Sequence, residues 1–179
     1  MLVIGIDTGV SGGMALYSEG LILECYDVPY IWEKLKTKSK AKKLPDGKVI
    51  PGKFKRRKKI DYMRLTVILT HWQSMGAADI FIELIHSMPR DSPVAAFSFG
   101  TAFGAFNMAG ATLGLKSHFI TPQQWKKALG LINEDKEASL ELAREMFGTE
   151  FFKLKKDHNK AEAALISAYG FSVLSAKQA

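Results

Sequence analysis

The chain opens with an apolar run, Val3 to Asp7, that is followed closely by a glycine-rich turn, Gly9 to Gly13. Its β-branched residues predict a buried strand, and the glycines predict a tight turn into a second strand. Asp7 ends this strand, where a carboxylate is costly unless something compensates its charge. The usual compensation in such a position is a metal ion or a metal that is bound to phosphate. The alternative is an aspartate that caps the hairpin turn through its own backbone.

A length of 179 residues predicts one well-buried domain spanning 1–179 and is too short for two ordinary domains. The single cysteine, Cys25, excludes an internal disulfide and a cysteine-rich zinc site, and it is typical of a reducing compartment. No apolar run approaches the ~20 residues that span a bilayer. We therefore expect a cytoplasmic protein with no membrane partner.

The net charge of +7 comes from one segment, residues 34–59, which holds thirteen basic residues and one acid, Asp46. The rest of the chain holds 12 basic and 17 acidic residues and is mildly acidic. A basic run of this kind supplies salt-sensitive affinity for nucleic acid. The alternative is a solvated insertion without function. We expect a basic insertion at about 30–60 that forms a mobile loop, because Pro and Gly recur through its second half. A short helix is expected within it, around 31–36.

The hydrophobic periodicity predicts a three-strand meander followed by alternating helices and strands. The expected strands are 2–7, 13–18, 21–27, 79–85 and 116–121, and the expected helices are 60–75, 95–113, 122–130, 135–147 (capped by Asn133) and 159–176. This order predicts an α/β fold with a five-stranded mixed sheet, three strands of meander plus two further strands, and helices on both faces.

Three acids lie beside or inside apolar elements instead of on polar faces: Asp7, Glu83 and Glu162. Neighbouring strands are about 4.8 Å apart, so Asp7 and Glu83 can reach one cation, and a helix start can add Glu162. Oxygen ligands select Mg²⁺, with Mn²⁺ as a substitute. Two such ions ~4 Å apart would support phosphodiester hydrolysis. For Glu162 alone, an ordinary surface residue is the competing interpretation.

A fourth ligand is left open among three residues that precede the last helix. His158 shares the helical face of Glu162, and Asn159 nearly does. Asp157 is five residues before Glu162, about 140° around a helix, but could approach from a non-helical segment.

Six short motifs, taken in order, resemble those of RuvC-type Holliday junction resolvases, and most closely the bacteriophage-encoded members. They are Ile4-Gly5-Ile6-Asp7-Thr8-Gly9, Ile82-Glu83, Ser98-Phe99-Gly100 leading into Gly104, Pro122-Gln123-Gln124-Trp125-Lys126-Lys127, Asp135-Lys136 and Asp157-His158-Asn159-Lys160-Ala161-Glu162-Ala163. No single motif is specific, but the ordered set is, and it covers nearly the whole chain outside residues 30–60.

The resemblance implies an RNase H-like fold, a homodimer, and paired metal-dependent nicks in opposed strands of a four-way DNA junction, which leave 5′-phosphate ends. It implies two Mg²⁺ ions, with Asp7 bridging both, Glu83 holding one, and Glu162 with Asp157 or His158 holding the other. The helix that carries Phe99, Phe103 and Phe106 would lie at or near the dimer interface. The expected DNA-binding residues are Lys53, Lys55, Arg56, Arg57, Lys58, Arg90, Lys126, Lys127, Lys136 and Lys160.

The chain departs from the family pattern in three places. Asn159 stands where the family usually has an acid or a histidine, and Glu162 replaces the more usual aspartate. His86, Met88 and Arg90 occupy a loop where some relatives place a phenylalanine that stacks on a junction base. The basic insertion is additional to the minimal pattern, and we expect it to wrap duplex arms.

Other functions compete with junction resolution. An RNase H-type ribonuclease acting on hybrid or structured RNA would use the same acids, and a non-catalytic branched-DNA-binding module would use only the basic segment. The opening turn also resembles the first phosphate loop of actin-like kinases and ATPases, but the chain has no room for two lobes and no second phosphate loop, so no nucleotide cofactor is expected. The expected setting is the cytoplasm of a bacterial or phage-infected cell.

Overall fold

The computed structural model describes residues 1–85 and 92–178, which are built around a five-stranded sheet of order β3-β2-β1-β8-β9. The central strand β1 (Val3–Asp7) pairs antiparallel with β2 (Gly13–Ser18), which pairs antiparallel with β3 (Leu21–Asp27). On its other side, β1 pairs parallel with β8 (Asp79–Glu83), which pairs parallel with β9 (Lys116–Ile120). The predicted mixed sheet, a meander extended by two further strands, is confirmed.

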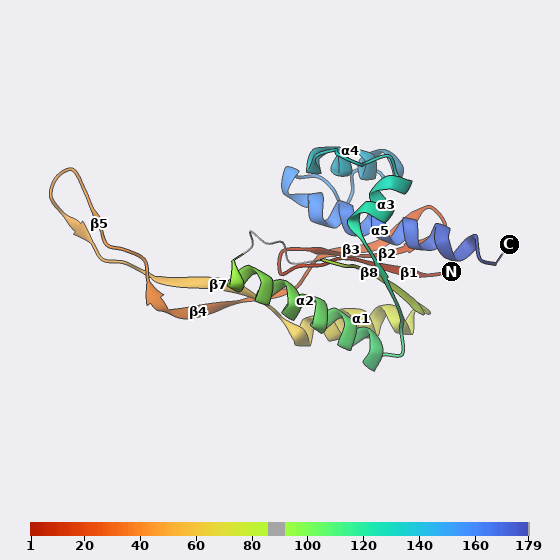
Figure 1. The fold of residues 1–179 in the computed structure, drawn as a ribbon, viewed down its shortest axis with the longest axis horizontal. Helices are drawn as coiled ribbons and strands as arrows, with labels where there is room; N and C mark the ends of the chain where they lie inside the picture. The colour runs from red at the N-terminus through yellow and green to blue at the C-terminus, as the bar shows by residue number, and fades with distance from the viewer. Residues whose placement is uncertain (86–91, 179) are drawn as a thin grey trace.

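Helices cover both faces of this sheet, as Figure 1 shows. One face carries α3 (Pro122–Ala128), α4 (Lys136–Phe147) and α5 (His158–Ser175), and a short 3-10 helix, η1 (Lys155–Asp157), leads into α5. The opposite face carries α1 (Tyr62–Ser74) and α2 (Pro93–Thr112).

The alternation of side chains along β1 divides the core into two layers. Val3 packs into the cluster that includes residues of α4 and α5, whereas Ile4 and Ile6 pack into the cluster that includes α1 and α2. Gly5 lies against α5, where a Cβ atom would overlap the carbonyl oxygen of Ala163. The backbone of α5 can therefore lie directly on the strand that ends at Asp7.

Most helix boundaries lie within a few residues of the predicted ones, and the caps show why. Thr121 forms a capping box with Gln124 at the start of α3, as the Thr-Pro sequence predicts. The predicted cap of α4 is wrong, because the side chain of Asp135 accepts the N–H groups of Glu137 and Ala138. Asn133 instead adopts a left-handed conformation, with φ at 65°, in the turn before the helix.

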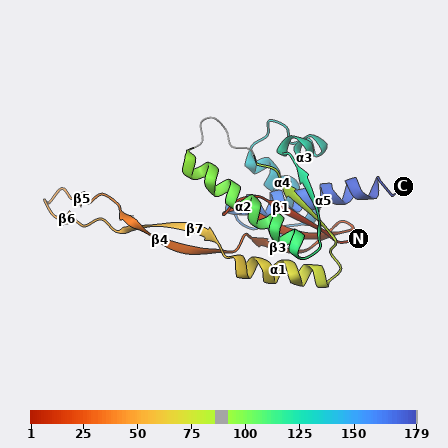
Figure 2. The same ribbon diagram turned by 60° about the horizontal axis from the view of Figure 1, so that its bottom comes forward.

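The basic insertion is an extended hairpin, not a loop. Strands β4 (Tyr30–Lys38) and β7 (Phe54–Ile60) pair antiparallel, and β5 (Lys42–Lys43) pairs with β6 (Val49–Ile50) near the tip. We call residues 30–60 the hairpin arm. Figures 1 and 2 both show it projecting away from the sheet and the helices.

The predicted short helix at 31–36 is therefore wrong, because cross-strand pairing overrides the local preference for helix. Tyr30 is opposite Ile60 and Lys34 is opposite Arg56, so β4 is held by residues more than twenty positions away in sequence. Such pairs stabilise a two-stranded ribbon but leave no periodic apolar signal in the sequence.

Helix α2 is apolar yet poorly covered by the rest of the chain. By length and composition it is the one helix among residues 1–85 and 92–178 that could cross a membrane, although such helices are also common in soluble proteins. The expectation that no segment reaches this length and hydropathy does not hold for α2. Phe106 is fully buried against the sheet, whereas Phe97 and Met108 are 75% and 68% exposed. One side of α2 therefore belongs to the core and the other presents apolar side chains outward.

Candidate active site

Asp7 is held at the end of the central strand by a turn that only glycine fits. The residue is opposite Gly13 in the antiparallel ladder and is buried. A Cβ atom at Gly12 would overlap the backbone oxygen of Asp7, and one at Gly13 would overlap the backbone oxygen of Asn159. The turn after β1 therefore closes tightly beside Asp7 and touches the start of α5.

Glu83 ends the parallel neighbour of β1, and two hydrogen bonds fix its position. Its Oε1 atom accepts the indole N–H of Trp125 at 2.9 Å, and its backbone oxygen accepts the hydroxyl of Thr8 at 2.7 Å. The carboxyl ends of parallel strands lie at the same edge of a sheet, so the topology brings Glu83 to the side where Asp7 lies.

Glu162 reaches the same place from the first turns of α5. It is buried, and its Oε1 atom accepts the hydroxyl of Ser139 at 3.4 Å. The ammonium group of Lys126 lies 3.3 Å from the same oxygen, so α3 and α4 both contribute partners to this carboxylate.

Asp7, Glu83 and Glu162, which we call the acidic cluster, line one open cavity of about 490 Å³ together with Lys126 and Lys136. Burial raises the pKa of Asp7 well above its usual value, and the charges of Glu83 and Glu162 raise it further. Burial also raises the pKa of Glu83. The hydrogen bond from Trp125 lowers this pKa, and the charge of Glu162 raises it further. The cluster thus concentrates negative charge that two lysines only partly offset.

The donor set of the acidic cluster fits a divalent cation. Carboxylate oxygens from three separate elements are the ligands that Mg²⁺ and Mn²⁺ prefer. In the stretches 1–85 and 92–178, no group of three or more His, Cys, Asp or Glu side chains is arranged closely enough to hold a metal ion as it stands. Mutual repulsion and the Lys126 ion pair give a physical reason why the carboxylates are not drawn together.

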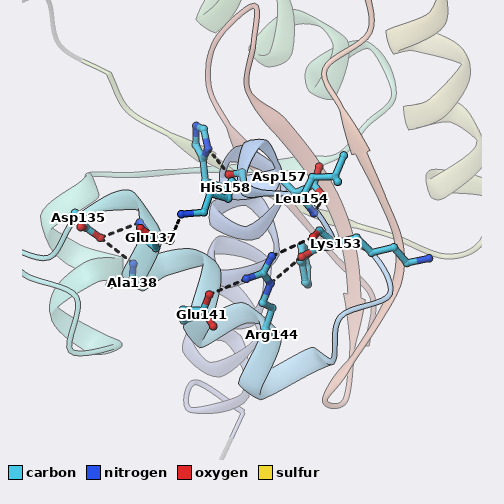
Figure 3. A network of polar contacts seen from close by, with 11 residues as sticks. Asp135, Glu137, Ala138, Glu141, Arg144, Lys153, Leu154, Asp157 and His158 are labelled. Carbon is cyan, nitrogen blue, oxygen red and sulfur yellow. Dashed lines mark hydrogen bonds and ion pairs between the residues drawn. The ribbon is translucent and has the colours of Figure 1, made fainter.

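Two of the three candidates for the fourth ligand do not line this cavity. Asp157 Oδ2 accepts the backbone N–H of Leu154 at 2.8 Å, and its Oδ1 lies 3.1 Å from the ammonium group of Lys160. The Nδ1 atom of His158 lies 3.2 Å from the backbone oxygen of Lys155 (Figure 3). His158 lines a separate cavity with α4 residues.

Asn159, the third candidate, does line the cavity of the acidic cluster. Its side-chain N–H donates to the backbone oxygen of Ser11 in the turn after β1. Of the three candidates, Asn159 is thus the one that the structure brings beside Asp7 and Glu162.

The predicted DNA-binding residues fall into separate groups. Lys53, Lys55, Arg56, Arg57 and Lys58 all lie on the hairpin arm, and Lys126 and Lys136 border the acidic cluster. Lys127 is exposed on α3. Lys160 is mostly buried in its ion pair with Asp157 and does not face outward, while Arg90 is outside the described residues.

Sequence reasoning did not assign site roles to Trp125 and Ser139. The sequence places Trp125 only in a motif that begins a helix. Its full burial beside Glu83 depends on how α3 packs against the sheet. Ser139 carries no sequence signal, because its contact with Glu162 joins positions on α4 and α5.

No protein-family model matches the chain, and no curated protein matches it. Two solved structures of RuvC from Thermus thermophilus are similar in fold. The structure in complex with a Holliday junction substrate is 16% identical, with a TM-score of 0.58 over 97% of this chain and 96% of that chain. A second RuvC structure is 17% identical, with the same TM-score and coverage. The chain therefore has the RNase H-like fold that the family resemblance implied.

Proposed function

We propose that this protein is a metal-dependent, structure-selective endonuclease that cuts opposed strands of four-way DNA junctions. The observation that carries the proposal is the acidic cluster, in which three carboxylates from β1, β8 and α5 line one cavity. Two further facts support it: the fold is similar to that of RuvC bound to a Holliday junction, and the motifs of that family occur in order.

Asp7, Glu83 and Glu162 would hold divalent cations, with Asn159 beside them. When bound, such ions activate a water molecule and stabilise the leaving oxygen of a phosphodiester. Trp125 holds the carboxylate of Glu83 in place, which pre-organises that ligand. Lys126 and Lys136, at the rim of the same cavity, would bind the phosphate, and Lys126 would exchange its contact with Glu162 for one with the substrate.

A second copy of the chain would cover the exposed side of α2. Val94, Phe97 and Met108 are all at least two-thirds exposed, and Gly100 and Gly104 have open space where a Cβ would point. This modifies the expected interface, because Phe106 belongs to the core and Phe103 packs against Phe119. A homodimer would present two acidic clusters to opposed strands of one junction.

The test is incubation with synthetic four-way junctions, forks, linear duplexes and RNA–DNA hybrids in Mg²⁺, followed by mapping of the nicks. The wild-type protein should cut the junction in pairs of opposed strands and leave 5′-phosphates. Asp7→Asn and Glu83→Gln should each lose about 100-fold or more of this activity while still binding junctions. The exposed acids provide matched controls, and Asp27→Asn and Glu145→Gln should cut normally.

Two results would redirect the proposal. Preferred cutting of the hybrid would identify an RNase H-type ribonuclease instead. Junction binding with no cutting of any substrate would leave a branched-DNA-binding module.

A further inference from the structure

We propose that one face of the hairpin arm binds duplex DNA through a row of cations held beside exposed aromatic rings. This inference rests on the proposed function and specifies which surface takes the duplex. We call this surface the aromatic–basic face, and it consists of Tyr30, Trp32, Lys34 and Lys38 from β4 with Phe54, Arg56 and Lys58 from β7.

The strand register places these side chains on one side of the ribbon. Residues directly opposite in an antiparallel ladder point to the same face, and Trp32 is opposite Lys58 while Lys34 is opposite Arg56. Beyond a register shift, Lys38 is opposite Phe54.

Cation–π contacts confirm this assignment independently. The ammonium groups of Lys34 and Lys38 lie 4.1 and 4.8 Å from the centre of the Phe54 ring. Lys58 lies 4.1 Å from the centre of the Tyr30 ring. Each contact restrains a long, flexible cation over a ring, which lowers the entropy lost when a phosphate binds.

The opposite face of the arm carries a smaller net positive charge. It carries Ile31 opposite Lys59 and Glu33 opposite Arg57, with Lys55 farther along. Glu33 forms an ion pair with Arg57, which neutralises one cation on that side. Charge complementarity therefore favours the aromatic–basic face as the surface for a polyanion.

The arm has dimensions that suit duplex DNA. The nine residues of β4 extend about 30 Å at ~3.3 Å per residue, close to the ~34 Å of one DNA turn. A two-stranded ribbon is also narrow enough to enter the major groove. The aromatic residues Tyr30, Trp32 and Phe54 are 38%, 57% and 41% exposed, so apolar surface is available to contact the groove.

The arm begins beside the acidic cluster. The ammonium group of Lys58 donates to the hydroxyl of Ser11 at 3.3 Å, and Ser11 lines the cavity that holds Asp7. Another cavity, of about 570 Å³, lies between residues 57–60 and the start of α2. A duplex held by the aromatic–basic face would therefore extend outward from the site where the proposed cut is made.

The test compares two variants that each remove one lysine charge, from opposite faces of the arm: Lys34→Gln on the aromatic–basic face and Lys59→Gln on the other face. Binding of a labelled linear DNA duplex and a four-way junction is followed by fluorescence anisotropy over a series of salt concentrations, with EDTA present so that nothing is cut. Loss of one phosphate contact should lower the salt slope by about 0.9 and weaken binding about 5-fold at 0.15 M salt for the first variant. The second variant should bind like the wild-type protein.

Three outcomes would overturn the proposal: equal losses in both variants, no loss in either, or competition by duplex RNA as strong as by duplex DNA. The last follows because the major groove of duplex RNA is too deep and narrow for side chains to read. The assay needs no metal or cleavage, so the arm can fail this test while the nuclease proposal stands, and the reverse also holds.

Discussion

Replacing Asp7 by asparagine should make the protein more stable, although the same change should abolish cleavage. Asp7 is buried beside Glu83 and Glu162, and its raised pKa means that folding disfavours the ionised carboxylate. Asparagine is nearly the same size and carries no charge, so it removes the repulsion without opening a cavity. A residue whose role is to bind a cation is expected to lower the stability of the metal-free protein while being required for its activity.

The expected gain is about 1–2 kcal/mol in the free energy of unfolding at pH 7 without divalent metal, the usual range for relieving one unfavourable feature. Each unit by which a pKa is raised corresponds to about 1.4 kcal/mol, and Lys126 and Lys136 offset part of the repulsion. For a chain of this length the gain corresponds to about 2–8 °C in Tm, measurable by calorimetry or circular dichroism.

The pH dependence has a definite sign. Because the folded-state pKa of Asp7 is raised, the wild-type protein loses stability as pH rises from the usual value of 3.8 through the raised value. The advantage of Asp7→Asn should therefore be full above that window and should disappear as pH falls below 3.8. Saturating Mg²⁺ should reverse the order of stability at pH 7, because only the wild-type site would bind it tightly.

Asp157→Asn is the matched control, and its effect should have the opposite sign. Although burial opposes ionisation of Asp157, the Leu154 N–H and Lys160 outweigh it and hold its pKa below the usual value. Removing that charge should cost about 1.5–3 kcal/mol at pH 7, and the loss should vanish when pH falls through the lowered pKa. If Asp7→Asn destabilised the protein as Asp157→Asn does, Asp7 would be a structural residue.

Two further predictions concern the framework of the site and its assembly. Gly5→Ala should lower the free energy of unfolding by about 1–3 kcal/mol in chemical denaturation, because the added methyl group would push α5 away from β1. An unchanged free energy of unfolding would contradict the close packing of β1 and α5. Phe97→Asp should convert a dimer to a monomer in analytical ultracentrifugation without changing the circular dichroism spectrum, because Phe97 is 75% exposed. A wild-type protein that sediments as a monomer would contradict the proposed dimer interface.

The sheet and the acidic cluster could be predicted because their signals are local. Asp7 and Glu83 each end an apolar, β-branched run, and buried strands that end in acids are visible in sequence alone. The parallel pairing of β1 and β8 then brings those acids to one edge.

The hairpin arm could not be predicted because its signals are non-local. Residues 31–36 include good helix formers, and nothing nearby indicates that Lys34 pairs with Arg56. The cation–π contacts on Phe54 and Tyr30 also join residues from different strands.

The surroundings of the acidic cluster were hidden for the same reason. The hydrogen bond from Trp125 to Glu83 and the ion pair between Lys126 and Glu162 depend on how α3 packs across β8 and α5. The choice among Asp157, His158 and Asn159 depended on where the 3-10 turn ends, a boundary that sequence patterns fix only to within a few residues.

The most direct test of the shared-cation site is a titration of the protein with Mn²⁺, followed by calorimetry or by electron paramagnetic resonance. The wild-type protein should bind Mn²⁺, and Asp7→Asn and Glu162→Gln should each weaken binding by at least about 10-fold, while Asp157→Asn should leave it nearly unchanged. Equal Mn²⁺ binding by the wild-type protein and Asp7→Asn, or loss of binding only in Asp157→Asn, would contradict a metal site built on Asp7, Glu83 and Glu162.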